Sequence, residues 1–253
     1  MNASGEVLAY IKIPMTGTGN DRVRHEASVL SKLATYQVLR NHIPTLLFAG
    51  EWQDRYILIE DALQGSSGPA RLTNAHFQFL QTLWDTDPIH RSGEDIVDEV
   101  SEEWGAIRVH VDLKWKQLAE EALLFAKRRI GGMKVPCGVT HGDFAPWNTR
   151  TDNGNLGVFD WECAGWSQPI WWDIFHFETQ ARTLLNRPTR NGIPKADHPA
   201  FHTMYMMYLL SSTCRIMRDE PTATHGLLYR RERLAAALRG QTSSRSARLC
   251  LGG

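Results

Sequence analysis

The sequence predicts an α+β fold with two lobes: a small N-terminal lobe built on an antiparallel sheet and a larger, mostly helical C-terminal lobe. Three observations support this class. Strand and helix patterns alternate over the first 60 residues, the segment 64–69 (Gln-Gly-Ser-Ser-Gly-Pro) is typical of a flexible connector, and helical periodicity dominates after it. We therefore expect lobes at 1–63 and 64–239, and a disordered Ser/Arg/Gly-rich tail at 240–253.

The small lobe is expected to combine one helix with three strands. Alternation of apolar residues predicts the first strand and places Leu8, Tyr10 and Lys12 on one of its faces. The expected elements are a strand at 6–13, a Gly/Thr-rich loop at 15–20, a helix from a capping Asp21 to about Ala34, and strands at 47–52 and 55–60.

The larger lobe is expected to be helical around one pair of short strands. Asn153-Gly154 is a hairpin turn signal between those strands. The expected elements are helices at 73–84, 167–185, 199–218 and 225–238, two helices within 95–129, and short strands around a loop within 135–150 and at 155–161.

Composition excludes several function classes. Lys plus Arg and Asp plus Glu each number 28, so no basic field favours nucleic acid or an acidic membrane surface. The four cysteines lie far apart, which fits neither a zinc site nor a disulfide framework and is typical of a reducing compartment. No segment is apolar enough to span a membrane or to act as a signal peptide, so we expect a cytoplasmic protein. No feature indicates a protein partner.

One motif carries the chemistry. His141-x-Asp143 is followed four residues later by Asn148, and Asp160 comes twelve residues after Asn148 at the end of an apolar strand. Phosphoryl transfer needs these types, because a carboxylate must orient and deprotonate the attacking hydroxyl and hard oxygen ligands must hold magnesium on the nucleotide phosphates. The plainer reading is a turn Asp, a capping Asn and an Asp at a strand end.

The motif from His141 to Asp160 resembles that of the aminoglycoside phosphotransferase family, which includes choline-type kinases and has a protein-kinase-like fold. The resemblance implies that Asp143 is the catalytic base and that Asn148 and Asp160 bind Mg²⁺. It further implies that His141 belongs to the catalytic loop and that Asp173, on the next helix, supports this loop. The plainer reading of Asp173 is a solvated acid near a helix N-terminus.

The same resemblance implies a nucleotide site in the small lobe. Lys12 lies on an otherwise apolar strand, and Glu26 points to the packed side of the following helix. A buried acid is costly unless it is paired, so we expect a Lys12–Glu26 ion pair that places the ammonium on the nucleotide phosphates. Ile59, Glu60 and Asp61 match the hinge strand, the segment whose backbone would hydrogen-bond the nucleobase.

One departure from the kinase pattern concerns the phosphate cover. A Gly-rich strand pair normally precedes the Lys strand, but only 11 residues precede Lys12 here. Gly17-x-Gly19 follows the lysine instead. We therefore expect a truncated small lobe with an exposed strand edge, in a chain that folds yet binds nucleotide weakly.

The sequence as a whole predicts a kinase that transfers phosphate from ATP (or GTP), with Mg²⁺, to a hydroxyl of a small molecule. The alternatives are a nucleotide-binding or inactive relative, and an unrelated metal-dependent hydrolase that would not need Lys12 and Glu26 to meet. From Ser167 onward the chain has 12 basic and 6 acidic residues, which argues against a polycationic aminoglycoside as substrate. Five of nine tryptophans lie between 147 and 172, and we favour core packing over a substrate pocket for them.

Overall fold

The structure, a computed structural model, describes residues 6–185, 197–219 and 224–249. The chain forms two compact units, one of residues 1–89 and 137–192 and the other of residues 90–136 and 193–253. These boundaries fall at other positions than the 64–69 connector. The division into lobes at 1–63 and 64–239 therefore stays a prediction.

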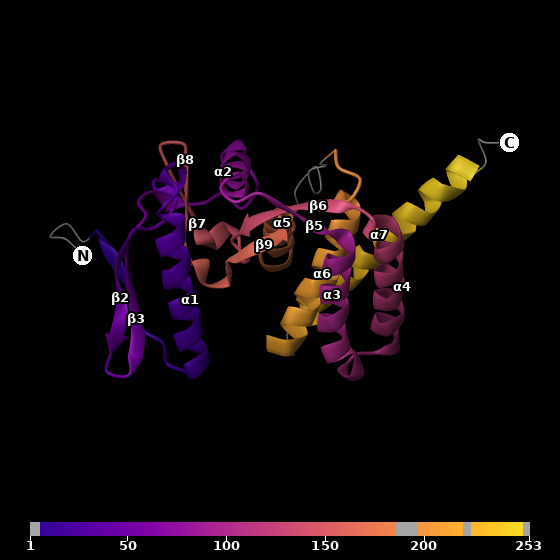
Figure 1. Cartoon of the computed structure of the whole chain (residues 1–253), viewed down its shortest axis with the longest axis horizontal. Helices are drawn as coiled ribbons and strands as arrows, with labels where there is room; N and C mark the ends of the chain where they lie inside the picture. The colour runs from indigo at the N-terminus through magenta and orange to yellow at the C-terminus, as the bar shows by residue number, and fades with distance from the viewer. Residues whose placement is uncertain (1–5, 186–196, 220–223, 250–253) are drawn as a thin grey trace. The chain divides into compact units, whose positions relative to one another are not determined.

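The first unit contains a three-stranded antiparallel sheet in the order β1-β3-β2 (Figure 1). Tyr10 pairs with Glu60 and Lys12 with Leu58. The turn at Gln53-Asp54 has φ values of 47° and 63°, both left-handed, which suits a tight hairpin. The expected small sheet is confirmed, with strands β1 (Ala9–Lys12), β2 (Leu46–Trp52) and β3 (Arg55–Asp61).

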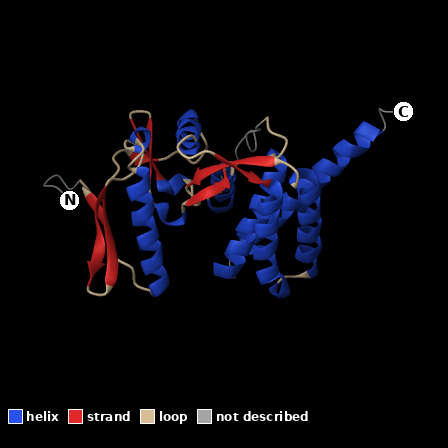
Figure 2. Cartoon of the chain, viewed as in Figure 1, coloured by secondary structure: helices blue, strands red, loops and turns tan. Residues whose placement is uncertain are grey.

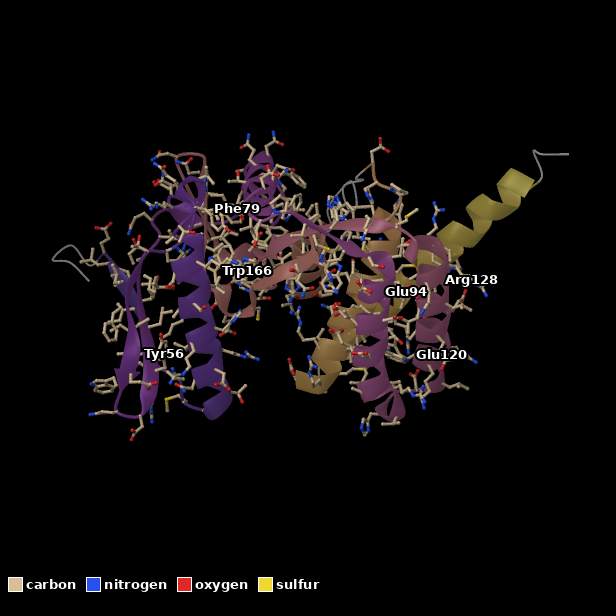
Figure 3. The ribbon with its side chains drawn as sticks, viewed as in Figure 1. Tyr56, Phe79, Glu94, Glu120, Arg128 and Trp166 are labelled. Carbon is tan, nitrogen blue, oxygen red and sulfur yellow. The ribbon has the colours of Figure 1, made fainter. Side chains whose placement is uncertain are left out.

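Helix α1 (Gly17–Leu33) packs against this sheet through an apolar face (Figure 1). The prediction of its start was wrong. The Thr16 side chain caps the helix by accepting a hydrogen bond from the backbone N–H of Gly19 at 3.0 Å. Gly17 and Gly19 therefore lie in the first turn of α1 instead of in a loop, and Asp21 is an exposed residue inside the helix. On its other contacts, Arg24 lies 4.4 Å from the ring centre of Tyr56 (Figure 3).

The remainder of the first unit surrounds a β-hairpin. The hairpin belongs to a sheet with the order β4-β7-β8, and its turn at Asn153-Gly154 has positive φ at both residues, as the sequence predicts. The elements are β4 (Ser66–Ser67), α2 (Asn74–Trp84), η3 (Pro146–Asn148), β7 (Thr149–Asp152) and β8 (Asn155–Val158).

The helix predicted at 167–185 begins later than expected. Residues Gly165–Pro169 form strand β9, which pairs with β6 (Lys134–Thr140), and α5 runs only from Trp172 to Leu184. The reason is local, because Ser167 adopts a left-handed φ of 70° and Pro169 has no N–H for a helical hydrogen bond.

A cluster of buried aromatic rings forms the core of the first unit. Phe79 stacks on Phe144 at 6.0 Å between ring centres, and Phe144 lies 5.5 Å from Phe177 (Figure 3). Trp161 joins them against Phe79 at 6.4 Å. All four side chains are at most 2% exposed. Because Phe144 belongs to the 141–148 motif, this core holds the loop from below. The tryptophan prediction is borne out in part, since Trp161 is buried whereas Trp147 is 39% exposed.

The second unit is mostly helical (Figure 2). The expected break within 95–129 lies at 108–112, where Asp112 caps the following helix by accepting from the N–H of Trp115 at 2.8 Å. Helix α6 packs against all three other long helices of this unit. The elements are β5 (Ile89–Ser92), α3 (Gly93–Ile107), α4 (Leu113–Ile130), α6 (Phe201–Asp219) and α7 (Thr224–Leu249).

Helix α7 extends beyond the end expected for it. The composition predicts a disordered tail from 240, but the helix continues to Leu249. No glycine or proline lies between 241 and 249 to stop it. Residues 250–253 of the expected tail lie outside the described residues. In the described part of the chain, no helix combines the length and apolar character needed to cross a membrane.

The corrected helix start makes a testable prediction. Thr16→Ala removes the side-chain acceptor of α1 and should lower the free energy of unfolding by about 1 kcal/mol in urea titrations. Asp21→Ala, the control, removes an exposed side chain and should change it by less than about 0.5 kcal/mol. A larger effect at Asp21 than at Thr16 would contradict this assignment of the cap.

Candidate active site

The 141–148 motif forms a tight loop between β6 and β7 whose shape depends on Gly142. Its φ is +77°, a conformation that L side chains rarely adopt. A Cβ at this position would also collide with the backbone carbonyl of Cys163. The glycine therefore lets the catalytic-type loop approach the segment that follows Asp160.

Asp173, on α5, binds the backbone of this loop. Its carboxylate accepts hydrogen bonds from the N–H groups of His141 at 2.8 Å and Gly142 at 3.0 Å. The side chain is fully buried. Burial raises the pKa of Asp173, and the neighbouring His141 and the two N–H donors oppose this rise. The solvated alternative for Asp173 is therefore wrong, and its contacts are those expected of a residue that supports the loop.

The carboxylate of Asp143 is held from two sides. Its Oδ1 lies 2.8 Å from His176 Nε2, and its Oδ2 accepts a hydrogen bond of 2.9 Å from the amide nitrogen of Asn148. The same nitrogen donates to the Asp143 carbonyl at 2.9 Å. The Asp143 side chain is 32% exposed whereas that of His176 is 4% exposed. A fixed carboxylate thus remains accessible from outside the protein.

His141 ties the loop to the end of β8. Its Nε2 lies 2.9 Å from the carbonyl oxygen of Phe159, and its Nδ1 accepts from the N–H of Asp143 at 3.3 Å. Since a carbonyl can only accept, these partners assign the ring proton to Nε2. The ring also lies 4.6 Å from that of Trp161. His141 therefore has a structural position beneath Asp143 and does not itself face a substrate.

The predicted Lys12–Glu26 ion pair is present, and Asp160 joins it. Lys12 Nζ lies 2.7 Å from both carboxylate oxygens of Glu26 and 2.7 Å from Oδ1 of Asp160. Glu26 is fully buried and also accepts from the N–H of Trp161 at 2.9 Å. Burial alone would lower the pKa of Lys12, yet the attraction of Glu26 and the hydrogen bonds to both acids leave it above its ordinary value.

Asp160 owes its orientation to an unusual backbone conformation. Its φ and ψ of 70° and 61° are left-handed, which is tolerated by Asp better than by most residues. The side chain is 36% exposed, so Lys12 covers only part of it. Among the described residues, no group of three His, Cys, Asp or Glu side chains could hold a metal ion alone.

The hinge strand ends beside a recess of about 260 Å³ in the first unit. Glu60 and Asp61 line it, but Ile59 does not, because it points to the opposite face of β3. The N–H of Asp61 is already bonded to the Thr45 carbonyl at 3.0 Å. The recess is lined by Tyr10, Pro44, Glu60, Asp61, Leu63, Arg150 and Phe159.

The side chain of Glu60 is a feature that sequence reasoning missed, since only its backbone was considered. It is 2% exposed, and its Oε2 has no hydrogen-bond partner among the described residues. Burial raises the pKa of Glu60 to about 7, with Lys12 opposing and nearby Glu26 and Asp160 adding to the rise. The period of two along β3 could have found it, because Glu60 and Leu58 share the face of Lys12.

His176 is the second missed residue. The sequence offered no metal-ligand spacing for it, and it therefore received no role. Its signal was its distance of three residues from Asp173, because residues i and i+3 share one face of a helix. A helix that presents Asp173 to the loop must also present His176.

Comparison with known proteins identifies the family. The family described as "Phosphotransferase enzyme family" matches residues 22–184 of the chain. The chain belongs to this family. A search among curated proteins found no match.

Solved structures support the same fold. A GDP complex of a mutant aminoglycoside 2'-phosphotransferase-IIIa superposes with a TM-score of 0.63 at 15% identity, over 94% of this chain and 87% of that one. A thermostable mutant of aminoglycoside phosphotransferase APH(4)-Ia gives a TM-score of 0.56 at 19% identity, over 92% and 87% of the two chains. The family and the kinase-like α+β fold expected from the sequence are therefore confirmed, and the protein is a phosphotransferase by family.

The buried acid Glu60 predicts a pH-dependent stability. Its folded pKa of about 7 exceeds the ordinary value of 4.5, so the folded state binds the proton more tightly and stability falls as pH rises between these values. Glu60→Gln cannot ionise and should gain stability relative to the parent over this window. The gain should reach about 1–3 kcal/mol above pH 7 in urea titrations.

The matched control is Glu51→Gln, which neutralises an exposed acid on the neighbouring strand β2. It should change the free energy of unfolding by less than about 1 kcal/mol at every pH. A Glu60→Gln effect that is the same at pH 5 and pH 8 would show that Glu60 ionises normally in the folded protein.

Proposed function

We propose that the protein transfers the γ-phosphate of ATP or GTP to a hydroxyl group of a small molecule, with Asp143 as the base. The single observation that carries this proposal is the Asp143 carboxylate, fixed by His176 and Asn148 yet accessible, in the unit that also holds the Lys12–Glu26–Asp160 cluster. A fixed, accessible carboxylate can orient an attacking hydroxyl and accept its proton as the new P–O bond forms.

The acceptor hydroxyl needs a free lone pair on Asp143. Each carboxylate oxygen has about two acceptor positions, and one on each oxygen is used by His176 or Asn148. The accessible positions therefore remain for the substrate. His176 and Asn148 would keep the carboxylate from rotating, so positioning is established before the substrate arrives.

The nucleotide side of the proposal rests on Lys12, Glu26 and the hinge strand. Lys12 would place its ammonium on the phosphates, with Glu26 holding the lysine in place. Glu60 and Asp61 would border the base in the recess, and Ile59 would contribute through the fold of β3 alone. The relatives favour this assignment, because one was solved with GDP and another with ADP and hygromycin B.

Asn148 and Asp160 fit a magnesium ion. The described hydrogen bonds of the Asn148 amide use its nitrogen, which leaves its carbonyl oxygen for a cation, and Asp160 is only partly covered by Lys12. Both supply the hard oxygen ligands that Mg²⁺ prefers, with nucleotide phosphates and waters completing the shell. When bound, Mg²⁺ would neutralise charge on the phosphates.

The acceptor is proposed as a class. Choline-like, sugar and amino-alcohol hydroxyls all fit, whereas a polycationic aminoglycoside is disfavoured by the excess of basic residues after Ser167. The contact of Lys12 with Glu26 favours a kinase over a metal-dependent hydrolase, which would not need it. Free Cys137, Cys163 and Cys214 agree with the cytosolic location that belongs to this proposal.

The central experiment substitutes the base. Asp143→Asn keeps the side-chain size but removes the proton acceptor, and should lower turnover at least about 100-fold in an ATP- and GTP-consumption screen over small hydroxyl compounds. Asp152→Asn, an exposed acid in the β7–β8 hairpin, is the control and should retain parental turnover. Thermal unfolding checks that both variants fold.

The outcomes separate the alternatives. Turnover of Asp143→Asn within a few-fold of the parent would contradict the role of Asp143. A parent chain that binds nucleotide but turns over no compound would favour the nucleotide-binding or inactive alternative.

His176 generates a further prediction as a positioning residue. His176→Ala removes a buried donor to a carboxylate and should lower kcat about 10- to 100-fold with little change in KM for the nucleotide. His176→Gln can still donate to Asp143 and should recover part of the loss. The control His202→Ala changes an exposed histidine of α6. Equal losses for Ala and Gln, or a loss confined to KM, would contradict a positioning role.

A further inference from the structure

The carboxyl group of Glu60 lies buried beside the recess and lacks a partner for one oxygen. Its Oε2 is inaccessible to solvent and accepts no hydrogen bond from any described residue. Burying a polar group without a partner is costly, and most such groups in proteins are satisfied. An unpaired acceptor at the wall of a recess is therefore suited to a donor supplied by a ligand.

The other walls of the recess indicate what kind of ligand this is. Tyr10 and Phe159 supply aromatic side chains, and Leu63 and Pro44 supply aliphatic ones. Flat apolar and aromatic walls suit a planar heterocycle, which packs by its faces and hydrogen-bonds by its edge.

Glu60 is the available acidic acceptor of this wall. The other acid, Asp61, already receives the N–H of Thr45 on its Oδ1 at 2.6 Å. Arg150 offers only donors, and its guanidinium lies 5.7 Å from the ring centre of Phe159. A carboxyl group retains an acceptor oxygen whether or not it is protonated, so recognition by Glu60 does not depend on its charge.

We propose that Glu60 accepts a hydrogen bond from the exocyclic amino group of the nucleobase and selects amino-purine nucleotides. This inference rests on the proposed function, because it names the part of the nucleotide that the recess would read. Adenine carries such an amino group at C6 and guanine carries one at C2. A base without the group leaves Glu60 buried and unpaired, and a site with an unpaired buried polar group rejects that ligand strongly.

The experiment uses two matched nucleotide pairs on the whole chain with Mg²⁺. ATP and purine riboside triphosphate differ only in the 6-amino group, and GTP and ITP differ only in the 2-amino group. Titration calorimetry gives the dissociation constant of each. The parent should bind the amino member of at least one pair about 10- to 100-fold more tightly, and the pair that responds tells whether adenine or guanine is read.

Two variants assign this selectivity to Glu60. Glu60→Met fills the space without an acceptor and should reduce the ratio within the responding pair to about threefold or less. Glu60→Gln keeps a carbonyl acceptor and should preserve most of the ratio, which also guards against a folding defect in the Met variant. Glu51→Gln, an exposed acid of the same sheet, is the control and should leave the ratio unchanged.

The failures are distinguishable. If the parent binds the nucleotides without discrimination in either pair, or if Glu60→Met keeps the parental ratio, the role of Glu60 is wrong and the proposed function stands. If none of the four nucleotides binds to the parent, the proposed function is wrong and the inference falls with it.

Discussion

The candidate site depends on one ammonium group shared between carboxylates. Lys12 lies within 2.7 Å of both Glu26 and Asp160, so a single cation joins β1, α1 and the residue after β8. Glu26 is fully buried, and a buried acid without this partner would be strongly destabilising. One positive charge cannot fully compensate three nearby acids, and the third, Glu60, accordingly has a raised pKa. The cluster thus explains both the position of Asp160 and the unusual state of the hinge strand.

A second anchor fixes the catalytic-type loop without using any charge pair. Asp173 holds the loop by two backbone N–H groups, while Phe144 inserts the middle of the loop into the aromatic core. The side chain of Asp143 is left between His176 and Asn148. Backbone, core and side-chain contacts therefore restrict the same eight residues from three directions, which is the arrangement that a preorganised site requires.

The sequence predicted the elements better than their ends. Alternation along β1 and β3 and the 3.6-residue period of α1 follow from burial, so they are visible in the residues themselves. The start of α1 was missed because Thr16 and Asp21 are both good caps, and only the folded backbone selects between them. The Lys12–Glu26 pair was predictable because a buried acid needs a partner. His176 and the Glu60 side chain were missed because their neighbours come from distant segments, which no local pattern reveals.

The separation of the paired residues along the chain bears on how the protein folds. Lys12 and Asp160 are 148 positions apart, and Glu26 and the N–H of Trp161 are 135 apart. Loops of this length close slowly, since chain entropy is lost before the contact rewards it. During synthesis, β1 and α1 leave the ribosome long before their partners exist. Until the β7–β8 hairpin arrives, Glu26 has only Lys12 to neutralise it, and the N-terminal segment is a natural client for chaperones during that interval.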